Sequence, residues 1–279
     1  MNFIDTHLHL IYRAKLGYGW TDGIPPLATG DFTLDDFAAL TAGQGVAGAL
    51  FMEAGVDDAD YQAEARLIAG LVGQHGLLGL IASCRPETDA GFDAWLDECA
   101  SLQVHGFRRI LHVVPDDLST TATFRANLKK LGARGLAFDM CFLARQLPIA
   151  LDLARTCDDQ TLVLDHCGVP DIAAGAFDDW AKGITALAAL PHVHAKISGI
   201  SAYCAPGTAS TATLAPWVDH VIASFGADRC VWGSDWPVVN LGAGLPDWLQ
   251  ITRELLRGLT ESEQSAITNA TARRIYRLK

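Results

Sequence analysis

Three histidines and one aspartate stand in segments where their side chains could work together. The sharpest segment is Asp-Thr-His-Leu-His at 5–9. Residues two apart in a β-strand point to the same side, so His7 and His9 can present two imidazoles to one point. Neutral imidazole is a good ligand for zinc and similar metals. The pair therefore predicts a metal site or a polar catalytic site, although one such pair is not specific by itself.

The other two groups lie far along the chain. His166 ends one short apolar run and Asp235 ends another, just before Trp236 and Pro237. Each residue also has an ordinary structural explanation, because a lone histidine can bond a carbonyl and an aspartate can cap a turn. The combination with the first segment favours a shared functional site over coincidence.

Such a site forms only if the fold brings distant strand ends together. Short apolar runs without clean alternation recur along the chain, which is typical of strands buried on both faces of a parallel sheet. Amphipathic helical patterns lie between them, and Thr260 with Glu263 predicts a capping box that opens the last helix. We expect eight strands ending near the following residues: His9, Glu53, Ser83, Leu111, Cys141, His166, Ser198 and Asp235.

Eight strands with intervening helices in 279 residues predict an α/β fold, a (β/α)8 TIM barrel that forms a single domain over 1–279. A doubly wound open sheet is the alternative, because local pattern cannot show closure. In a barrel, the ends of the first, sixth and eighth strands share one mouth, where barrel sites lie. Long loops at 10–31, 200–212 and 236–247 follow strand ends there, and the first could act as a lid.

Charge and composition exclude several classes of protein. The formal net charge of −11 makes nucleic acid an unexpected partner, because an acidic surface repels phosphate. No apolar run reaches the ~20 residues of a membrane span, and the first residues do not resemble a signal peptide. Seven scattered cysteines without a CxxC pair argue against disulfides and zinc fingers. We expect a cytoplasmic protein acting on a small molecule, and a homo-oligomer remains open.

The chain resembles the amidohydrolase superfamily, specifically the amidohydrolase-2 group of predicted metal-dependent TIM-barrel hydrolases. Within that group it is most similar to the sugar lactonases and the 2-pyrone-4,6-dicarboxylate lactonases. The motifs that carry the resemblance span almost the whole chain. They are Asp-Thr-His-Leu-His at 5–9, Gly-Phe-Arg-Arg-Ile-Leu at 106–111, Leu-Asp-His-Cys-Gly-Val-Pro at 164–170, Gly-Ser-Asp-Trp-Pro at 233–237 and Asn-Ala-Thr-Ala-Arg-Arg-Ile-Tyr at 269–276.

The resemblance implies roles for the four residues. His7, His9 and His166 would be catalytic residues that, with Asp235, ligate a metal or replace one, and Asp235 would also be the general base. Two-metal members of the superfamily carry a bridging lysine at the end of strand four, whereas residues 108–112 are Arg-Arg-Ile-Leu-His. We therefore expect at most one divalent metal, zinc by its ligands. Some lactonases of the group need none, so a metal-free site stays open.

Other side chains near strand ends are candidate substrate contacts. They are Arg109, Glu53, Phe142, Trp236 and Ser198. The fork of Arg109 fits planar oxygens, whereas Arg108 is expected to point the other way, toward a helix. The roles of Glu53, His112 and Lys196 stay open, and Lys196 could be a structural ion-pair partner. The remaining histidines are expected at the surface or satisfied in the core: His75, His105, His192, His194 and His220.

The resemblance implies that the chain hydrolyses a lactone in carbohydrate catabolism, with Asp235 taking a proton from water. A sugar lactone is favoured over a carboxylated one, because few other cations lie at the strand ends. One alternative is a non-oxidative decarboxylase of an aromatic or muconate-type acid on the same barrel. Such enzymes tend to be longer. A second is an inactive barrel with a binding role, but unused desolvated polar groups would cost stability.

Overall fold

A computed structural model describes residues 1–279. Its eight strands pair in parallel, each with the next along the chain. The strands are β1 (Phe3–Leu8), β2 (Val46–Met52), β3 (Leu77–Ser83), β4 (Val104–Ile110), β5 (Ala137–Cys141), β6 (Leu162–Leu164), β7 (Val193–Ile197) and β8 (Cys230–Trp232).

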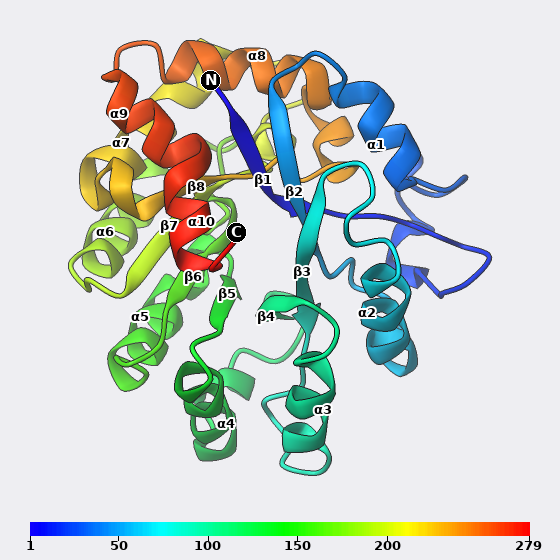
Figure 1. The fold of residues 1–279 in the computed structure, drawn as a ribbon. Coiled ribbons are helices and arrows are strands. Elements are labelled where there is room, and N and C mark those ends of the chain that lie inside the picture. The colour runs from blue at the N-terminus through cyan, green and yellow to red at the C-terminus, as the bar shows by residue number, and fades with distance from the viewer.

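Helices surround this ring of strands (Figure 1). They are α1 (Leu34–Thr41), α2 (Tyr61–Ala69), α3 (Phe92–Cys99), α4 (Ala122–Ala133), α5 (Leu147–Thr156), α6 (Phe177–Ala188), α7 (Thr211–Phe225), α8 (Leu245–Leu255), α9 (Glu261–Ser265) and α10 (Thr271–Ile275). The predicted capping box is confirmed, because the Thr260 hydroxyl accepts from the Glu263 N–H and opens α9. No helix is both long enough and apolar enough to cross a membrane.

Contacts between the first and last strands bring the barrel almost to closure. The N–H of Asp235 donates to the carbonyl of His7 at 2.8 Å, and the N–H of His9 donates to the carbonyl of Trp236 at 2.8 Å. An isolated parallel bridge joins Leu8 to Trp236. These bonds confirm the (β/α)8 barrel and exclude the doubly wound open sheet.

An irregularity in β1 decides where the first histidines point. Phe3 and Leu8 both pack in the large apolar cluster with the helices, whereas Ile4 belongs to the small cluster inside the barrel. Residues five apart in a regular strand would face opposite sides. The pairing with β2 shifts register between Asp5 and Leu8. We infer that this shift turns His7 and His9 into the barrel mouth.

The apolar core lies in two parts. A cluster of 62 buried residues fills the space between the sheet and the helices, and a cluster of 10 lies inside the barrel. Tyr276, just after α10, belongs to the inner cluster, and its carbonyl lies 2.8 Å from Nδ1 of His105 near the start of β4. The C-terminal helix therefore covers the end where the strands begin (Figure 1). The opposite end is left for the site.

The loop at 10–31 is fastened next to the mouth. Ile11 and Phe32 pair as an antiparallel bridge that ties the two ends of the loop together. The indole N–H of Trp20 donates to the carbonyl of Ala54, two residues beyond β2, at 2.9 Å. This anchoring places the loop over the end of β2. Its function as a lid stays a prediction.

Candidate active site

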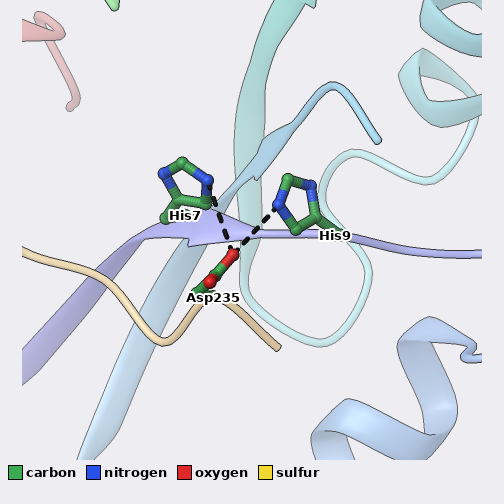
Figure 2. A group of neighbouring side chains, drawn as sticks. All are labelled: His7, His9 and Asp235. Atoms are coloured by element: carbon green, nitrogen blue, oxygen red, sulfur yellow. Dashed lines mark ion pairs between the residues drawn. The ribbon is translucent and has the colours of Figure 1, made fainter. Parts of the chain in front are cut away.

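The four residues singled out from the sequence meet at the barrel mouth. Nε2 of His9 lies 3.2 Å and Nε2 of His7 lies 3.7 Å from Oδ1 of Asp235. Nδ1 of His166 lies 3.9 Å from the other oxygen, Oδ2. All four side chains are buried. Figure 2 shows both imidazoles of the first segment directed at the carboxylate.

Two of these residues have strained backbones. His166, two residues after β6, has φ +53°, and Asp235, three residues after β8, has φ +58°. Side chains other than glycine rarely adopt this left-handed region, and it concentrates at functional sites. Glycines make the tight packing around them feasible. A Cβ on Gly199 would lie 2.4 Å from Oδ2 of Asp235, and one on Gly233 would lie 2.6 Å from Cβ of His7.

The proton arrangement of His9 follows from its contacts. Nδ1 lies 2.9 Å from the carbonyl of Met52, so Nδ1 is assigned the proton that is donated to this oxygen. In a neutral ring, Nε2 then offers only a lone pair. It faces Oδ1 of Asp235, another acceptor, at 3.2 Å. A proton or a cation must lie between two acceptors this close.

His7 is held from the opposite side of its ring. Nδ1 lies 3.5 Å from Oδ1 of Asp165, and the Lys196 ammonium lies 3.4 Å from the same nitrogen. Burial lowers the pKa of His7 well below its usual value, and burial also lowers the pKa of His166. Both imidazoles are therefore neutral at neutral pH. Neutral rings can accept a proton or bind a metal.

A buried ionic layer lies beneath the site. Lys196 on β7 donates to Oδ2 of Asp139 on β5 at 2.8 Å and lies 3.1 Å from Asp165. The Tyr276 hydroxyl donates to Oδ1 of Asp139 at 2.7 Å. Burial raises the pKa of Asp139 to about 6, although Lys196 opposes the shift. Lys196 therefore forms buried ion pairs, as the sequence allowed.

Arg108 faces the barrel interior, so the prediction that it points toward a helix is wrong. Its Nη1 lies 3.1 Å from Nε2 of His7, and its Nε donates to Oε1 of Glu53 at 2.6 Å. Burial lowers the pKa of Arg108, but the charges of Glu53, Cys141 and Asp165 and the hydrogen bond to Glu53 together outweigh burial and raise the pKa above its usual value. Two adjacent arginines at 108–109 give no alternation of apolar and polar residues, so the sequence does not show which of the two side chains faces the barrel interior. The partner that makes burial tolerable, Glu53, lies 55 residues away.

Arg109 points away from His7 and donates to Oε1 of Glu87 at 3.0 Å. Phe142 is fully buried, and Trp236 packs edge-on against Phe32 with ring centroids 5.5 Å apart. Both aromatic side chains therefore lie in apolar packing. The roles of all three predicted contacts in substrate binding stay predictions.

Ser198 and Glu53, the other two predicted contacts, do touch site residues. Oγ of Ser198 lies 3.0 Å from Nδ1 of His166. The Glu53 carboxylate receives Arg108 on one oxygen and the N–H of Gly55, at 3.0 Å, on the other. Ser198 is placed to orient an imidazole and Glu53 to hold a cation. That Ser198 and Glu53 contact substrate stays a prediction.

Two further side chains lie near the site: Tyr203, which no sequence motif marks, and His112, whose role the sequence leaves open. The ring of Tyr203 packs edge-on near His166, with centroids 6.3 Å apart. The only available signal was an aromatic residue in the long loop after β7. Nδ1 of His112 lies 3.2 Å from Sγ of Cys141. Burial and the charge of Arg108 lower the pKa of His112 to about 4, so it is a neutral group near the site.

His7, His9 and Asp235 suit a metal ion in type and spacing. One ligand atom from each lies within 4.8 Å of the others. Bonds of ~2.0–2.2 Å in a tetrahedral zinc site separate ligand atoms by roughly 3.4 Å, close to the 3.2 and 3.7 Å found here. The facing acceptors of His9 and Asp235 also call for a cation or a proton. The Arg108 donor on His7 opposes metal binding.

Solved structures resemble this fold over its whole length. An amidohydrolase from Burkholderia multivorans, described as having bound zinc, superposes with a TM-score of 0.91 and 26% sequence identity, covering 100% of both chains. A 2,6-dihydroxybenzoate decarboxylase from Rhizobium has a TM-score of 0.66 at 12% identity, covering 99% of both chains. At that identity, the likeness to the decarboxylase shows the fold alone.

Curated relatives also match most of the chain. An L-fucono-1,5-lactonase from Burkholderia ambifaria is 29% identical over 88% of this chain and 83% of its own. A 4-sulfomuconolactone hydrolase from Rhizobium radiobacter is 25% identical over 84% and 75%. The family model described as amidohydrolase matches residues 4–278. With a match of this extent and four convergent polar residues at the barrel mouth, the chain belongs to the amidohydrolase family.

Proposed function

We propose that this enzyme hydrolyses a lactone with Asp235 as the general base. The observation that carries the proposal is the Asp235 carboxylate, which lies among three imidazoles at the mouth of the barrel. Two of these imidazoles are neutral at neutral pH because burial lowers their pKa. A carboxylate in this setting can activate water next to a bound ester. Two relatives named for lactone hydrolysis support the substrate class.

The reaction needs one water and one proton carrier. Asp235 takes a proton from water as the water oxygen bonds to the lactone carbonyl carbon. The bond between that carbon and the ring oxygen then breaks, and Asp235 returns the proton to the leaving alkoxide. Without a metal, Arg108, a desolvated cation beside His7, stabilises the oxyanion. A divalent metal, zinc by its ligands, would be held by His7, His9 and Asp235 and would lower the pKa of bound water, once Arg108 has left Nε2 of His7.

The charges near the site favour a neutral sugar lactone. Arginines that follow or lie on the strands near the mouth already have carboxylate partners: Arg108 with Glu53, Arg109 with Glu87 and Arg85 with Asp58. A carboxylated substrate would have to compete for these cations. Hydroxyl groups of a sugar ring need only hydrogen-bonding partners such as Tyr203 or His112. We also propose that the substrate is a small molecule of carbohydrate catabolism and that the protein is cytoplasmic.

A substrate panel tests the proposal. Neutral aldonolactones, L-fucono-1,5-lactone among them, are compared with carboxylated lactones by a pH indicator, with spontaneous opening subtracted. Carbon dioxide release from hydroxybenzoates is assayed in parallel. We expect saturable opening of the neutral lactones and no carbon dioxide. Decarboxylation without lactone opening would reject the proposal in favour of the decarboxylase alternative, and inactivity on every compound would also count against it.

A further inference from the structure

The guanidinium of Arg108 points at the nitrogen of His7 that a metal ion would need. Nη1 lies 3.1 Å from Nε2, the atom that also faces Asp235. A guanidinium offers only N–H donors, so this contact is a hydrogen bond into the Nε2 lone pair. Coordination of zinc by Nε2 would use the same lone pair. The hydrogen bond and the metal bond therefore cannot form together.

Glu53 holds Arg108 in this position. Nε of Arg108 donates to Oε1 of Glu53 at 2.6 Å, and Nη2 donates to the Glu53 carbonyl at 2.6 Å. Both side chains are almost completely buried. Rotation of Arg108 away from His7 would break these bonds and leave a buried carboxylate without its cation, which is strongly unfavourable. Arg108 therefore gives way to a metal only at a cost.

We propose that Arg108 is a built-in cation that occupies Nε2 of His7 and competes with divalent metal ions for the site. The unchanged chain then binds zinc weakly, through an incomplete ligand set. Loss of the guanidinium frees His7 to join His9 and Asp235. This inference concerns the same site as the proposed function, but it depends only on the position of Arg108 and not on lactone hydrolysis.

The test measures zinc binding to chelator-treated protein by titration calorimetry, with metal analysis after dialysis. We expect Arg108→Met to bind zinc about ten-fold tighter or more. This variant leaves Glu53 buried and unpaired, so Arg108→Met with Glu53→Gln, which removes both charges, keeps the test open if the single variant does not fold. Arg109→Met is the matched control, because Arg109 pairs with Glu87 away from His7.

Adding His7→Asn to the double variant should erase the gain, because His7 is the ligand set free. Equal zinc affinity in the unchanged chain and the Arg108 variants would overturn the proposal. A gain of the same size in Arg109→Met, or one that survives loss of His7, would also overturn it. The readout is metal binding alone, so a negative result leaves the lactonase proposal standing. Likewise, a lack of lactone hydrolysis would not affect this inference.

Discussion

At the scale of single residues, the site depends on hydrogen bonds that orient its imidazoles. Ser198 contacts Nδ1 of His166, and the Met52 carbonyl receives Nδ1 of His9. The bond to Met52 leaves Nε2 of His9 facing Asp235, whereas Ser198 contacts the same nitrogen of His166 that lies 3.9 Å from Asp235. Outer partners of this kind commonly influence function nearly as much as the groups they orient.

Ser198→Ala should therefore lower kcat about ten-fold while the protein stays folded, because His166 loses its orienting partner. Steady-state kinetics on a lactone, with circular dichroism as the fold check, measure the effect. Ser201→Ala is a matched control, since its buried hydroxyl has no hydrogen-bond partner. Unchanged kcat in Ser198→Ala would show that this hydrogen bond does not matter for turnover.

The sequence could predict His7, His9, His166 and Asp235 because each lies in a short motif at the end of an apolar run. Arg108 could not be placed, because the face of a strand residue depends on register and adjacent arginines carry no apolar signal. Its partner Glu53 is on another strand end, so only the folded chain brings the two together.

At the scale of elements, the connections after the strands bring side chains within contact. Gly199 follows β7 and packs against both Asp235 and His166. The pairing of β1 with β2 shifts register between Asp5 and Leu8, and we infer that this shift directs His7 inward. The sequence predicted where the strands end, but a shift of this kind has no pattern of its own, because it arises from pairing with β2.

Gly199→Ala should reduce kcat by about a hundred-fold, because misplacement of catalytic groups by about 1 Å has effects of that size. The new Cβ would lie 2.4 Å from Oδ2 of Asp235 and 2.7 Å from Nδ1 of His166. Gly207→Ala supplies the control, since Gly207 has a similar φ of +74° and nothing within 4 Å. Both variants place alanine at a positive φ, but only the Cβ of Gly199→Ala would contact residues of the site. Equal kcat in the two variants would contradict this reading.

At the scale of the whole molecule, the C-terminal segment is tied to the barrel centre. The Tyr276 hydroxyl donates to both oxygens of Asp139, at 2.7 and 2.8 Å. That carboxylate also holds Lys196 beneath the site. The covered end and the open mouth are thus connected through one buried ionic layer.

Tyr276→Phe should lower the free energy of unfolding by about 1–3 kcal/mol, because it leaves a buried carboxylate short of a donor. Urea denaturation measures the loss. Tyr61→Phe removes a hydroxyl whose only bond is with Gln62 and should change stability little. Similar losses in the two variants would argue against a structural role for the buried layer.

His194 should contribute stability that rises with pH between about 4 and 6.5. Burial, helped by Arg274, lowers the pKa of His194 to about 4, so this residue binds fewer protons in the folded chain than in the unfolded chain in this window. Its contribution to stability is therefore lost as pH falls from 6.5 toward 4. His194→Gln should flatten part of this slope in urea titrations. An unchanged slope in His194→Gln would refute the assignment.

The barrel could be predicted because eight strand patterns alternate with helix patterns along the whole chain. Its near-closure could not be predicted, because it depends on hydrogen bonds from the N–H groups of Asp235 and His9 that no local sequence pattern reveals. The most direct test of the proposed mechanism is kcat for a neutral aldonolactone in Asp235→Asn. Turnover should fall to the background rate while the melting temperature stays near that of the unchanged chain. Turnover near that of the unchanged chain would contradict it.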